Sequence, residues 1–176
     1  MAGPERSQAS YAAMGGVLAA GSLAVLWLAC AAPSGRIGLT AAAGLFPVAA
    51  TLYAGRGAGY LCWASSALLG LFLLPDKGVA ALYLAFLGVY PVAKGRIESL
   101  NRPGLEWGLK LSCFNLALTL FWFVFQGLFL PQTPQWLKDN TLLCYGAGNL
   151  IFAAYDVGLS QLIARLRARL ARRKGR

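Results

Sequence analysis

The chain has 176 residues, of which 58% are hydrophobic and 12% are charged, and its formal net charge is +10. A water-soluble core of this size cannot bury so much apolar surface, which excludes an ordinary soluble globular protein. A soluble six-helix protein would need polar outward faces, whereas residues 116–130 are apolar nearly all round. The basic residues are not interleaved with aromatic ones, so we expect no nucleic-acid partner.

Apolar stretches of nearly membrane-spanning length follow one another along the whole chain, separated by short polar segments. A span needs about 20 apolar residues, and several stretches fall slightly short, so their boundaries are approximate. The sequence therefore predicts an all-α fold, a bundle of six transmembrane helices that forms a single integral membrane domain over residues 1–176. The predicted spans are 11–32, 37–55, 58–75, 79–93, 108–130 and 141–162, followed by a basic tail over 163–176.

Lysine and arginine are concentrated in alternate segments between these stretches. All but three of the 16 basic residues lie at the N-terminus, after the second and fourth stretches, or in the tail. The exceptions are Arg36, Lys77 and Lys138. By the positive-inside rule, this distribution predicts a multi-pass protein of the cell membrane with both termini in the cytoplasm. We expect the basic tail to meet anionic lipid head groups.

The first stretch carries small residues at every fourth position: Ala12, Gly16, Ala20 and Ala24. This spacing gives one helical face on which a second helix can approach the backbone closely. The face either packs against other helices of this chain or contacts a partner subunit, and the sequence leaves both interpretations open.

Ionisable and amide side chains gather at the predicted cytoplasmic ends of the last three stretches. Lys94 and Glu98 are four residues apart, as are Glu106 and Lys110, so each pair can meet on one helical face. Asp156 has no such local partner, and a buried carboxylate is costly unless it is paired. We therefore predict that Asp156 faces Lys110 or Lys94. The full predicted cluster is Lys94, Glu98, Glu106, Lys110, Asn115, Asn149 and Asp156.

Three roles are open for this cluster: a structural latch that holds three helices together, a docking surface, or a proton or ion relay. We favour a latch or a docking surface. The chain contains no histidine, which removes the commonest proton carrier at neutral pH.

A candidate ligand pocket toward the outer face would use Tyr60, Trp63, Trp122 and Gln126. Hydroxyl residues of the second and third stretches could contribute to it. The alternative, which we favour for each residue, is that the hydroxyls bond to carbonyls of their own helices and the aromatic rings lie at the membrane interface. These hydroxyl residues are Thr40, Thr51, Ser65 and Ser66.

Motifs for catalysis, cofactor binding and metal binding are not apparent in the sequence. It has no phosphate-binding glycine loop and no credible nucleophile arrangement. The four cysteines fall singly in four stretches, which indicates packing residues rather than a metal site. We expect no enzymatic activity, no cofactor and no metal.

The size, the six stretches, the cytoplasmic termini, the small-residue face and the glycine-marked loop 53–59 together resemble the substrate-binding S components of energy-coupling factor transporters. The resemblance implies that Ala12, Gly16, Ala20 and Ala24 meet a transmembrane coupling subunit that works with ATPases. The chain also resembles uncharacterised membrane proteins of Gram-positive, clostridia-like bacteria. That second resemblance lies in the Tyr90-Pro91, Glu106-Trp107, Gly148-Asn149 and Tyr155-Asp156 segments.

Two functions follow as expectations from these patterns. The first is a non-catalytic transport subunit of S-component type in a bacterial inner membrane. The second is a scaffold or assembly factor of the cell envelope that transports no substrate.

Overall fold

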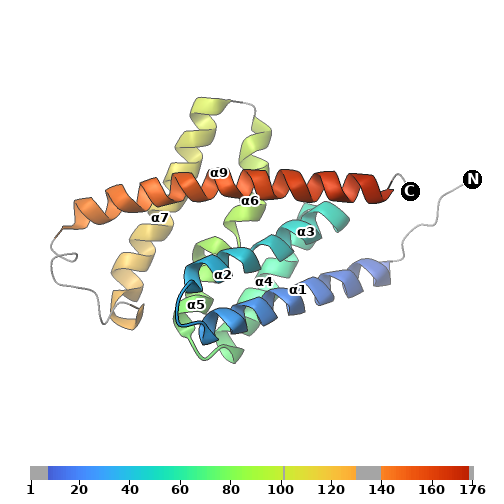
Figure 1. The fold of residues 1–176 in the computed structure, drawn as a ribbon, viewed down its shortest axis with the longest axis horizontal. Coiled ribbons are helices and arrows are strands. Elements are labelled where there is room, and N and C mark those ends of the chain that lie inside the picture. The colour runs from blue at the N-terminus through green and yellow to red at the C-terminus, as the bar shows by residue number, and fades with distance from the viewer. Residues whose placement is uncertain (1–7, 101, 130–139, 175–176) are drawn as a thin grey trace, which may run out of the picture. The chain divides into compact units, whose positions relative to one another are not determined.

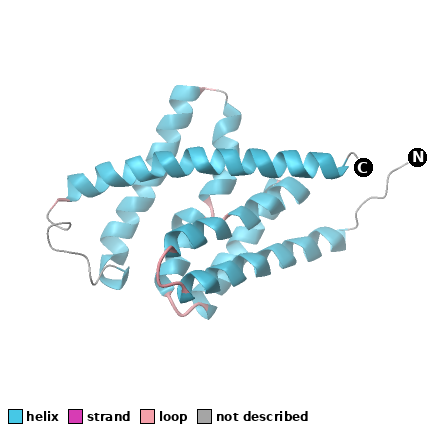
Figure 2. Cartoon of the chain, viewed as in Figure 1, coloured by secondary structure: helices cyan, strands magenta, loops and turns pink. Residues whose placement is uncertain are grey.

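A computed structural model describes residues 8–100, 102–129 and 140–174, and every described element in it is a helix (Figures 1 and 2). The predicted all-α class is confirmed for these residues. The α-helices are α1 (Gln8–Ala31), α2 (Arg36–Ala43), α3 (Leu45–Ala54), α4 (Arg56–Leu73), α5 (Lys77–Leu82), α6 (Tyr90–Ile97), α7 (Pro103–Phe129) and α9 (Thr141–Lys174). A π-helical turn, Tyr83–Leu87, follows α5, and a 3₁₀ turn, Glu98–Leu100, follows α6.

Within the described residues, four helical segments are long and apolar enough to cross a membrane: Ala12–Ala31, Arg36–Ala54, Lys77–Leu100 and Thr141–Arg169. The other two predicted stretches form α4 and α7, which are helical over their described residues but are not among these four. Large apolar side chains also point outward, including Phe72 at 82% exposure and Leu142 at 89%. Helices with such surfaces are compatible with a membrane protein.

The chain divides into two compact units, Met1–Ala93 and Lys94–Arg176, with the division inside α6. The sequence predicts a single integral membrane domain over residues 1–176.

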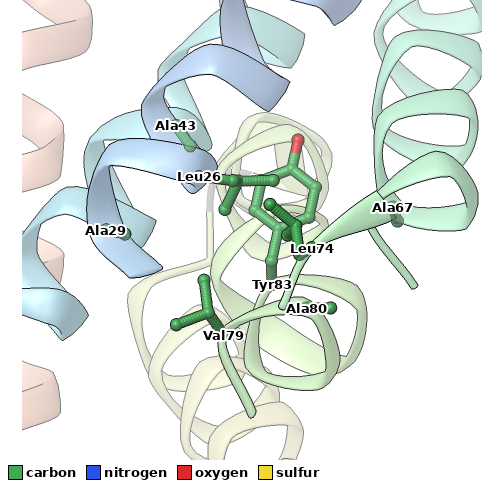
Figure 3. Packing of buried hydrophobic residues seen from close by; sticks show 8 residues of the cluster. All are labelled: Leu26, Ala29, Ala43, Ala67, Leu74, Val79, Ala80 and Tyr83. Carbon is green, nitrogen blue, oxygen red and sulfur yellow. The ribbon is translucent and has the colours of Figure 1, made fainter. Parts of the chain in front are cut away.

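Small residues allow the helices of unit 1 to pack closely. A Cβ atom added to Gly59 of α4 would collide with the Thr51 side chain and lie 2.9 Å from the Pro47 carbonyl oxygen, both in α3. Figure 3 shows the core, where Tyr83 and Leu74 lie with alanines from α1, α2 and α4. Close backbone approach through small residues is the usual way in which helices associate in lipid.

The second predicted span is interrupted at Gly44, which separates α2 from α3. Pro47 has no backbone N–H, so it cannot bond to the carbonyl of Ala43 four residues earlier. The hydroxyl of Ser22 in α1 donates to this carbonyl oxygen at 3.1 Å instead. The predicted span 37–55 therefore corresponds to the segment Arg36–Ala54, which consists of two helices, and the freed carbonyl has a partner, as burial requires.

The fourth predicted span, 79–93, also contains irregular backbone. The turn Tyr83–Leu87 is π-helical, and Gly88 donates its N–H to the carbonyl of Tyr83 at 2.9 Å. Pro91 lies just beyond this turn and lacks the N–H that a regular helix would use. Local π geometry is one way in which a membrane helix accommodates a proline.

The loops after α1 and after α4 lie at the same end of unit 1, because Arg36 forms an ion pair of 3.1 Å with Asp76. Asp76 also caps α5, since its Oδ1 accepts the Gly78 N–H at 2.8 Å. Lys77 donates to the carbonyls of Leu71 and Leu74 at the end of α4, at 2.7 and 2.9 Å.

In unit 2, α7 packs against α9, and contacts that run forward along α7 run backward along α9. The rings of Phe114 and Phe152 are stacked, with centroids 4.6 Å apart. At about 1.5 Å per residue, the 34 residues of α9 extend about 51 Å, well beyond a hydrocarbon core of about 30 Å. The predicted span 141–162 and the described part of the tail are thus one continuous helix.

Candidate functional site: a buried ionic cluster

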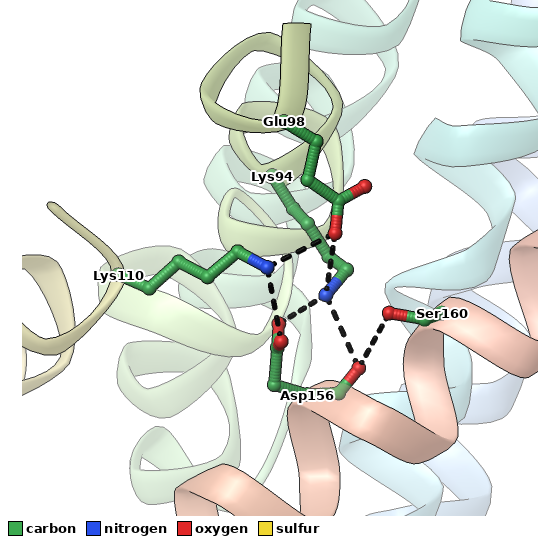
Figure 4. A network of polar contacts seen from close by, with 5 residues as sticks. All are labelled: Lys94, Glu98, Lys110, Asp156 and Ser160. Carbon is green, nitrogen blue, oxygen red and sulfur yellow. Dashed lines mark hydrogen bonds and ion pairs between the residues drawn. The ribbon is translucent and has the colours of Figure 1, made fainter. Parts of the chain in front are cut away.

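Four charged side chains of unit 2 meet in one cluster, which we name the ionic quartet: Lys94, Glu98, Lys110 and Asp156 (Figure 4). Lys94 comes from α6 and Glu98 from the 3₁₀ turn that follows it. Lys110 comes from the start of α7, and Asp156 from the middle of α9. The quartet therefore connects three segments that are far apart in the sequence.

Each carboxylate of the quartet contacts both ammonium groups. The two oxygens of Asp156 are divided between the lysines: Oδ1 pairs with Lys94, and Oδ2 lies 3.1 Å from the Nζ atom of Lys110. A single oxygen of Glu98, Oε1, lies 3.0 Å from the Nζ atom of each lysine. The quartet holds two positive and two negative groups, so its formal charges cancel.

Burial differs sharply within the quartet. The side chains of Lys94, Lys110 and Asp156 are 0%, 7% and 4% exposed, whereas that of Glu98 is 39% exposed. Removing one partner of a buried ion pair typically costs about 3–5 kcal/mol, because the other charge is left uncompensated. A partly exposed pair contributes about 0–1 kcal/mol. The loss of Asp156 should therefore destabilise the quartet most, whereas the ion pairs of Glu98 contribute little to stability.

Further contacts position Asp156 and Lys110. Lys94 also donates to the backbone carbonyl oxygen of Asp156 at 3.1 Å, and the hydroxyl of Ser160 donates to the same oxygen at 3.0 Å. The ammonium of Lys110 lies 5.6 Å from the ring centroid of Trp107, within the range of a cation–π contact. The quartet is thus supported from α7 and from the following turn of α9.

The predicted partners of Asp156 are confirmed, since it contacts both Lys94 and Lys110. The predicted Lys94–Glu98 pair is also confirmed. The predicted Glu106–Lys110 pair is wrong, because the Lys110 side chain turns toward Glu98 and Asp156. Lys110 pairs with two carboxylates, those of Glu98 and Asp156, rather than with the single carboxylate of Glu106 on its own helix. Glu106 lies outside the quartet and is half-buried.

Asn115 and Asn149, which the sequence placed in the same cluster, form a separate pair between α7 and α9. Each donates its amide to the other, at 3.0 and 3.1 Å, and also lies close to a carbonyl of its own helix. One turn further along, the hydroxyls of Thr119 and Tyr145 are 2.6 Å apart. We name these four residues the polar ladder.

The pair Thr119–Tyr145 was not predicted from the sequence. The signal was present, because an antiparallel register that joins Lys110 to Asp156 and Asn115 to Asn149 brings Thr119 opposite Tyr145. This pair can be identified only when the register of α7 against α9 is known. Charge pairing gives that register only after Asp156 has been paired with Lys110.

The small-residue face of α1 is exposed: Ala12, Gly16, Ala20 and Ala24 are all at the surface, and no neighbouring atom lies within 4 Å of a Cβ placed on Gly16. The opposite face of α1, which includes Ser22 and Leu26, is the one buried in unit 1. Within unit 1, the predicted face is therefore not used for packing.

The residues of the candidate ligand pocket are distributed over both units. Tyr60 and Trp63 are half-buried in α4 of unit 1, and Trp122 is half-buried in α7 of unit 2. The side chain of Gln126 lies outside the described residues. The Nε1 atom of Trp63 is buried without a hydrogen-bond partner among the residues that the structure describes.

The hydroxyl side chains behave as the favoured alternative expected. Thr40, Thr51 and Ser65 each donate to a carbonyl one turn earlier in their own helix, at 2.7, 2.9 and 2.8 Å. Ser66 does the same toward Cys62 at 2.7 Å, and its oxygen also lies 2.9 Å from the hydroxyl of Tyr83.

A buried hydroxyl triad in unit 1 was not predicted. The Tyr83 hydroxyl lies 2.9 Å from both Ser22 and Ser66, and all three residues are fully buried. Ser22 was missed because it lies in an otherwise apolar stretch, where one serine is an ordinary residue. The interruption of the second span by Pro47 is the local signal that such a hydroxyl donor is needed.

No group of three or more His, Cys, Asp or Glu side chains that could hold a metal ion occurs within residues 8–100, 102–129 and 140–174. In comparisons with known proteins, no family model, curated protein or solved structure matches the chain.

Proposed function

We propose that this chain is a non-catalytic, multi-pass subunit of a bacterial cytoplasmic membrane, of the substrate-binding S-component type, which docks on a transmembrane partner through α1. The observation that carries the proposal is the exposed face formed by Ala12, Gly16, Ala20 and Ala24. In lipid, where apolar contact alone does not distinguish a helix from an acyl chain, a face of small residues favours close contact with another helix.

In the proposed topology the chain crosses the membrane six times and keeps both termini in the cytoplasm. Six helical stretches in the predicted order support it, together with the alternating distribution of lysine and arginine. The Arg36–Asp76 ion pair also supports it, because the loops after α1 and α4 must then share the outer side. With this orientation the ionic quartet lies toward the cytoplasmic ends of its helices.

In this function the quartet acts as a structural latch for unit 2. Its charges cancel, and every member already contacts two opposite charges. A relay would need a group that exchanges protons readily at neutral pH, and the chain has no histidine. The exposed Arg165, Arg167 and Arg169 on the extension of α9 are positioned to meet anionic head groups.

A second candidate, a scaffold or assembly factor of the cell envelope, is favoured by one feature of unit 1. The polar groups at its centre are directed at one another, since the Tyr83 hydroxyl is enclosed by Ser22 and Ser66. A substrate would have to compete with these contacts.

Affinity purification in mild detergent tests the proposed partner, with mass spectrometry of the co-purifying proteins and small molecules. Gly16→Leu fills the small-residue face, whereas Gly146→Leu adds the same volume at an exposed position of α9 with no atom nearby. We expect a membrane coupling subunit with its ATPases, or a bound metabolite, to be retained by wild type and Gly146→Leu and lost from Gly16→Leu. Recovery of envelope-synthesis proteins without a ligand would support the scaffold instead.

Accessibility of engineered cysteines tests the topology. In a variant in which the four native cysteines are replaced by alanine, Lys138→Cys and Arg102→Cys are labelled in intact cells with a membrane-impermeant maleimide. The proposed topology predicts labelling of position 138 alone. Labelling of position 102 would contradict it.

A further inference from the structure

Glu98 differs from the other three members of the ionic quartet in a way that a simple latch does not require. It belongs to a 3₁₀ turn of three residues rather than to a long helix, and its side chain is 39% exposed. Asp156, whose side chain makes the same number of ion pairs with the lysines, is 4% exposed and lies within a 34-residue helix. A short turn at the surface can rearrange without disturbing the helices, so Glu98 can leave the quartet while Asp156 cannot.

The lysines meet Glu98 at a single point. Both Nζ atoms lie 3.0 Å from the same oxygen, Oε1. Without the Glu98 carboxylate, the remaining Lys94, Lys110 and Asp156 would carry a net charge of +1. Two convergent ammonium groups with one excess positive charge form a site for one oxygen of an external oxyanion.

The position of this site indicates which oxyanion it meets. The turn Glu98–Leu100 forms the end of the membrane-spanning segment Lys77–Leu100, where lipid head groups are found. Exposed Arg96 and Arg102 flank the turn on either side. Basic residues at this depth attract the phosphates of anionic lipids.

We propose that Glu98 is a displaceable internal occupant of a lipid-phosphate site, and that the phosphate of an anionic membrane lipid takes its place between Lys94 and Lys110. The ammonium groups then exchange one oxygen partner for another, while Asp156 keeps both lysines in position. This site is independent of the partner proposed for α1. It is also distinct from the general attraction of lipids by the tail, because it depends on one carboxylate.

The test is native mass spectrometry of the full chain in detergent, titrated with phosphatidylglycerol and, in parallel, with zwitterionic phosphatidylcholine. Glu98→Gln removes the competing charge and keeps the side-chain shape. Glu106→Gln is the matched control, because it makes the same change in net charge eight residues away, at a carboxylate outside the quartet. A third variant combines Glu98→Gln with Lys110→Gln.

We expect Glu98→Gln to bind phosphatidylglycerol about 2- to 5-fold more tightly than wild type, which corresponds to the release of a partly exposed ion pair. Glu106→Gln should bind as wild type does, and the double variant should lose the gain. An equal increase in Glu98→Gln and Glu106→Gln would overturn the proposal, because general electrostatics would then explain it. No increase in Glu98→Gln would overturn it as well.

A second measurement distinguishes the lipid from a free anion. The thermal midpoint of each variant is recorded in phosphatidylcholine nanodiscs with added inorganic phosphate, and in nanodiscs that contain phosphatidylglycerol. We expect the midpoint of Glu98→Gln, relative to Glu106→Gln, to rise with phosphatidylglycerol. A rise with inorganic phosphate alone would overturn the assignment of the site to a lipid.

Discussion

The helices of unit 1 approach one another where side chains are small, whereas α7 and α9 of unit 2 are joined by polar side chains. In unit 1, Gly59 lets α4 lie against α3 so closely that a Cβ atom would collide with Thr51. In unit 2, the contact between α7 and α9 includes Lys110–Asp156 and Asn115–Asn149. Unit 1 therefore depends on the close packing of small residues, and the contact between α7 and α9 in unit 2 depends on polar pairing.

Lipid supplies no hydrogen bonds, so each unit must satisfy its own polar groups. Unit 1 has to satisfy backbone groups, because Pro47 frees the carbonyl of Ala43, and one hydroxyl, Ser22, contacts that carbonyl. In unit 2, α7 and α9 are regular α-helices, so their polar side chains are available to pair with one another. In unit 1 a hydroxyl of one helix satisfies a freed backbone carbonyl of another, whereas in unit 2 the polar side chains of α7 and α9 pair with one another.

The largest expected effect is that of removing Asp156 from the ionic quartet of unit 2. Asp156→Ala leaves Lys94 and Lys110 buried with Glu98 as their remaining carboxylate, and we expect a loss of about 3–5 kcal/mol in the free energy of unfolding. Unfolding in detergent by denaturant titration measures it. Ser160→Ala is the control, because it removes one hydrogen bond, worth about 0.6 kcal/mol in membrane proteins. An unchanged unfolding midpoint in Asp156→Ala would show that the quartet does not stabilise the fold.

The close packing of unit 1 is tested by one added methyl group. Gly59→Ala should cost about 1–3 kcal/mol, because the α3–α4 contact has to open. Gly57→Ala lies in the same helix with nothing within 4 Å, and it should be neutral or gain up to about 1 kcal/mol in helix propensity. Equal effects of the two substitutions on the unfolding free energy would remove the distinction between the units.

The polar ladder predicts a smaller effect that belongs to unit 2. A double-mutant cycle of Asn115→Ala and Asn149→Ala should give a coupling energy of about 0.6–1.7 kcal/mol. A second cycle that combines Asn149→Ala with Ser65→Ala should give a value near zero, because Ser65 bonds to its own helix. Additivity in the first cycle would mean that the reciprocal amide pair contributes nothing.

The smallest expected effect is that of the hydroxyl triad in unit 1. Tyr83→Phe should cost about 0.6 kcal/mol, because Ser22 and Ser66 keep their carbonyl partners. Tyr53→Phe is the control, since the Tyr53 hydroxyl makes no hydrogen bond among the described residues. A cost for Tyr83→Phe as large as that of Asp156→Ala would contradict the view that unit 1 depends on packing rather than on polar pairing.

Much of unit 2 could be predicted from the sequence because its chemistry is explicit there. A carboxylate such as Asp156 within an apolar stretch needs an opposite charge, and few candidates are available. The exact partners could not be predicted in full, because Lys110 has Glu106 four residues away yet contacts Glu98 and Asp156. That choice depends on the position of the 3₁₀ turn, which a helical spacing rule does not describe.

Unit 1 was predicted less well, because its interruptions arise from the backbone. Hydropathy makes 37–55 and 79–93 look continuous, while Pro47 and Pro91 decide where regular hydrogen bonding stops. The exposed position of Ala12, Gly16, Ala20 and Ala24 could not be predicted either. Small residues suit contact with any helix, and only the packing of α1 shows which of its faces is already covered.

The most direct test of the account compares Asp156→Ala with a variant in which the whole ionic quartet is neutral: Lys94→Met, Glu98→Gln, Lys110→Met and Asp156→Leu. If the cluster stabilises unit 2 by compensating buried charges, the neutral variant should recover most of the unfolding free energy that Asp156→Ala loses, because no charge is left unpaired. A neutral variant as unstable as Asp156→Ala would contradict this account, since the loss would then not come from uncompensated charge.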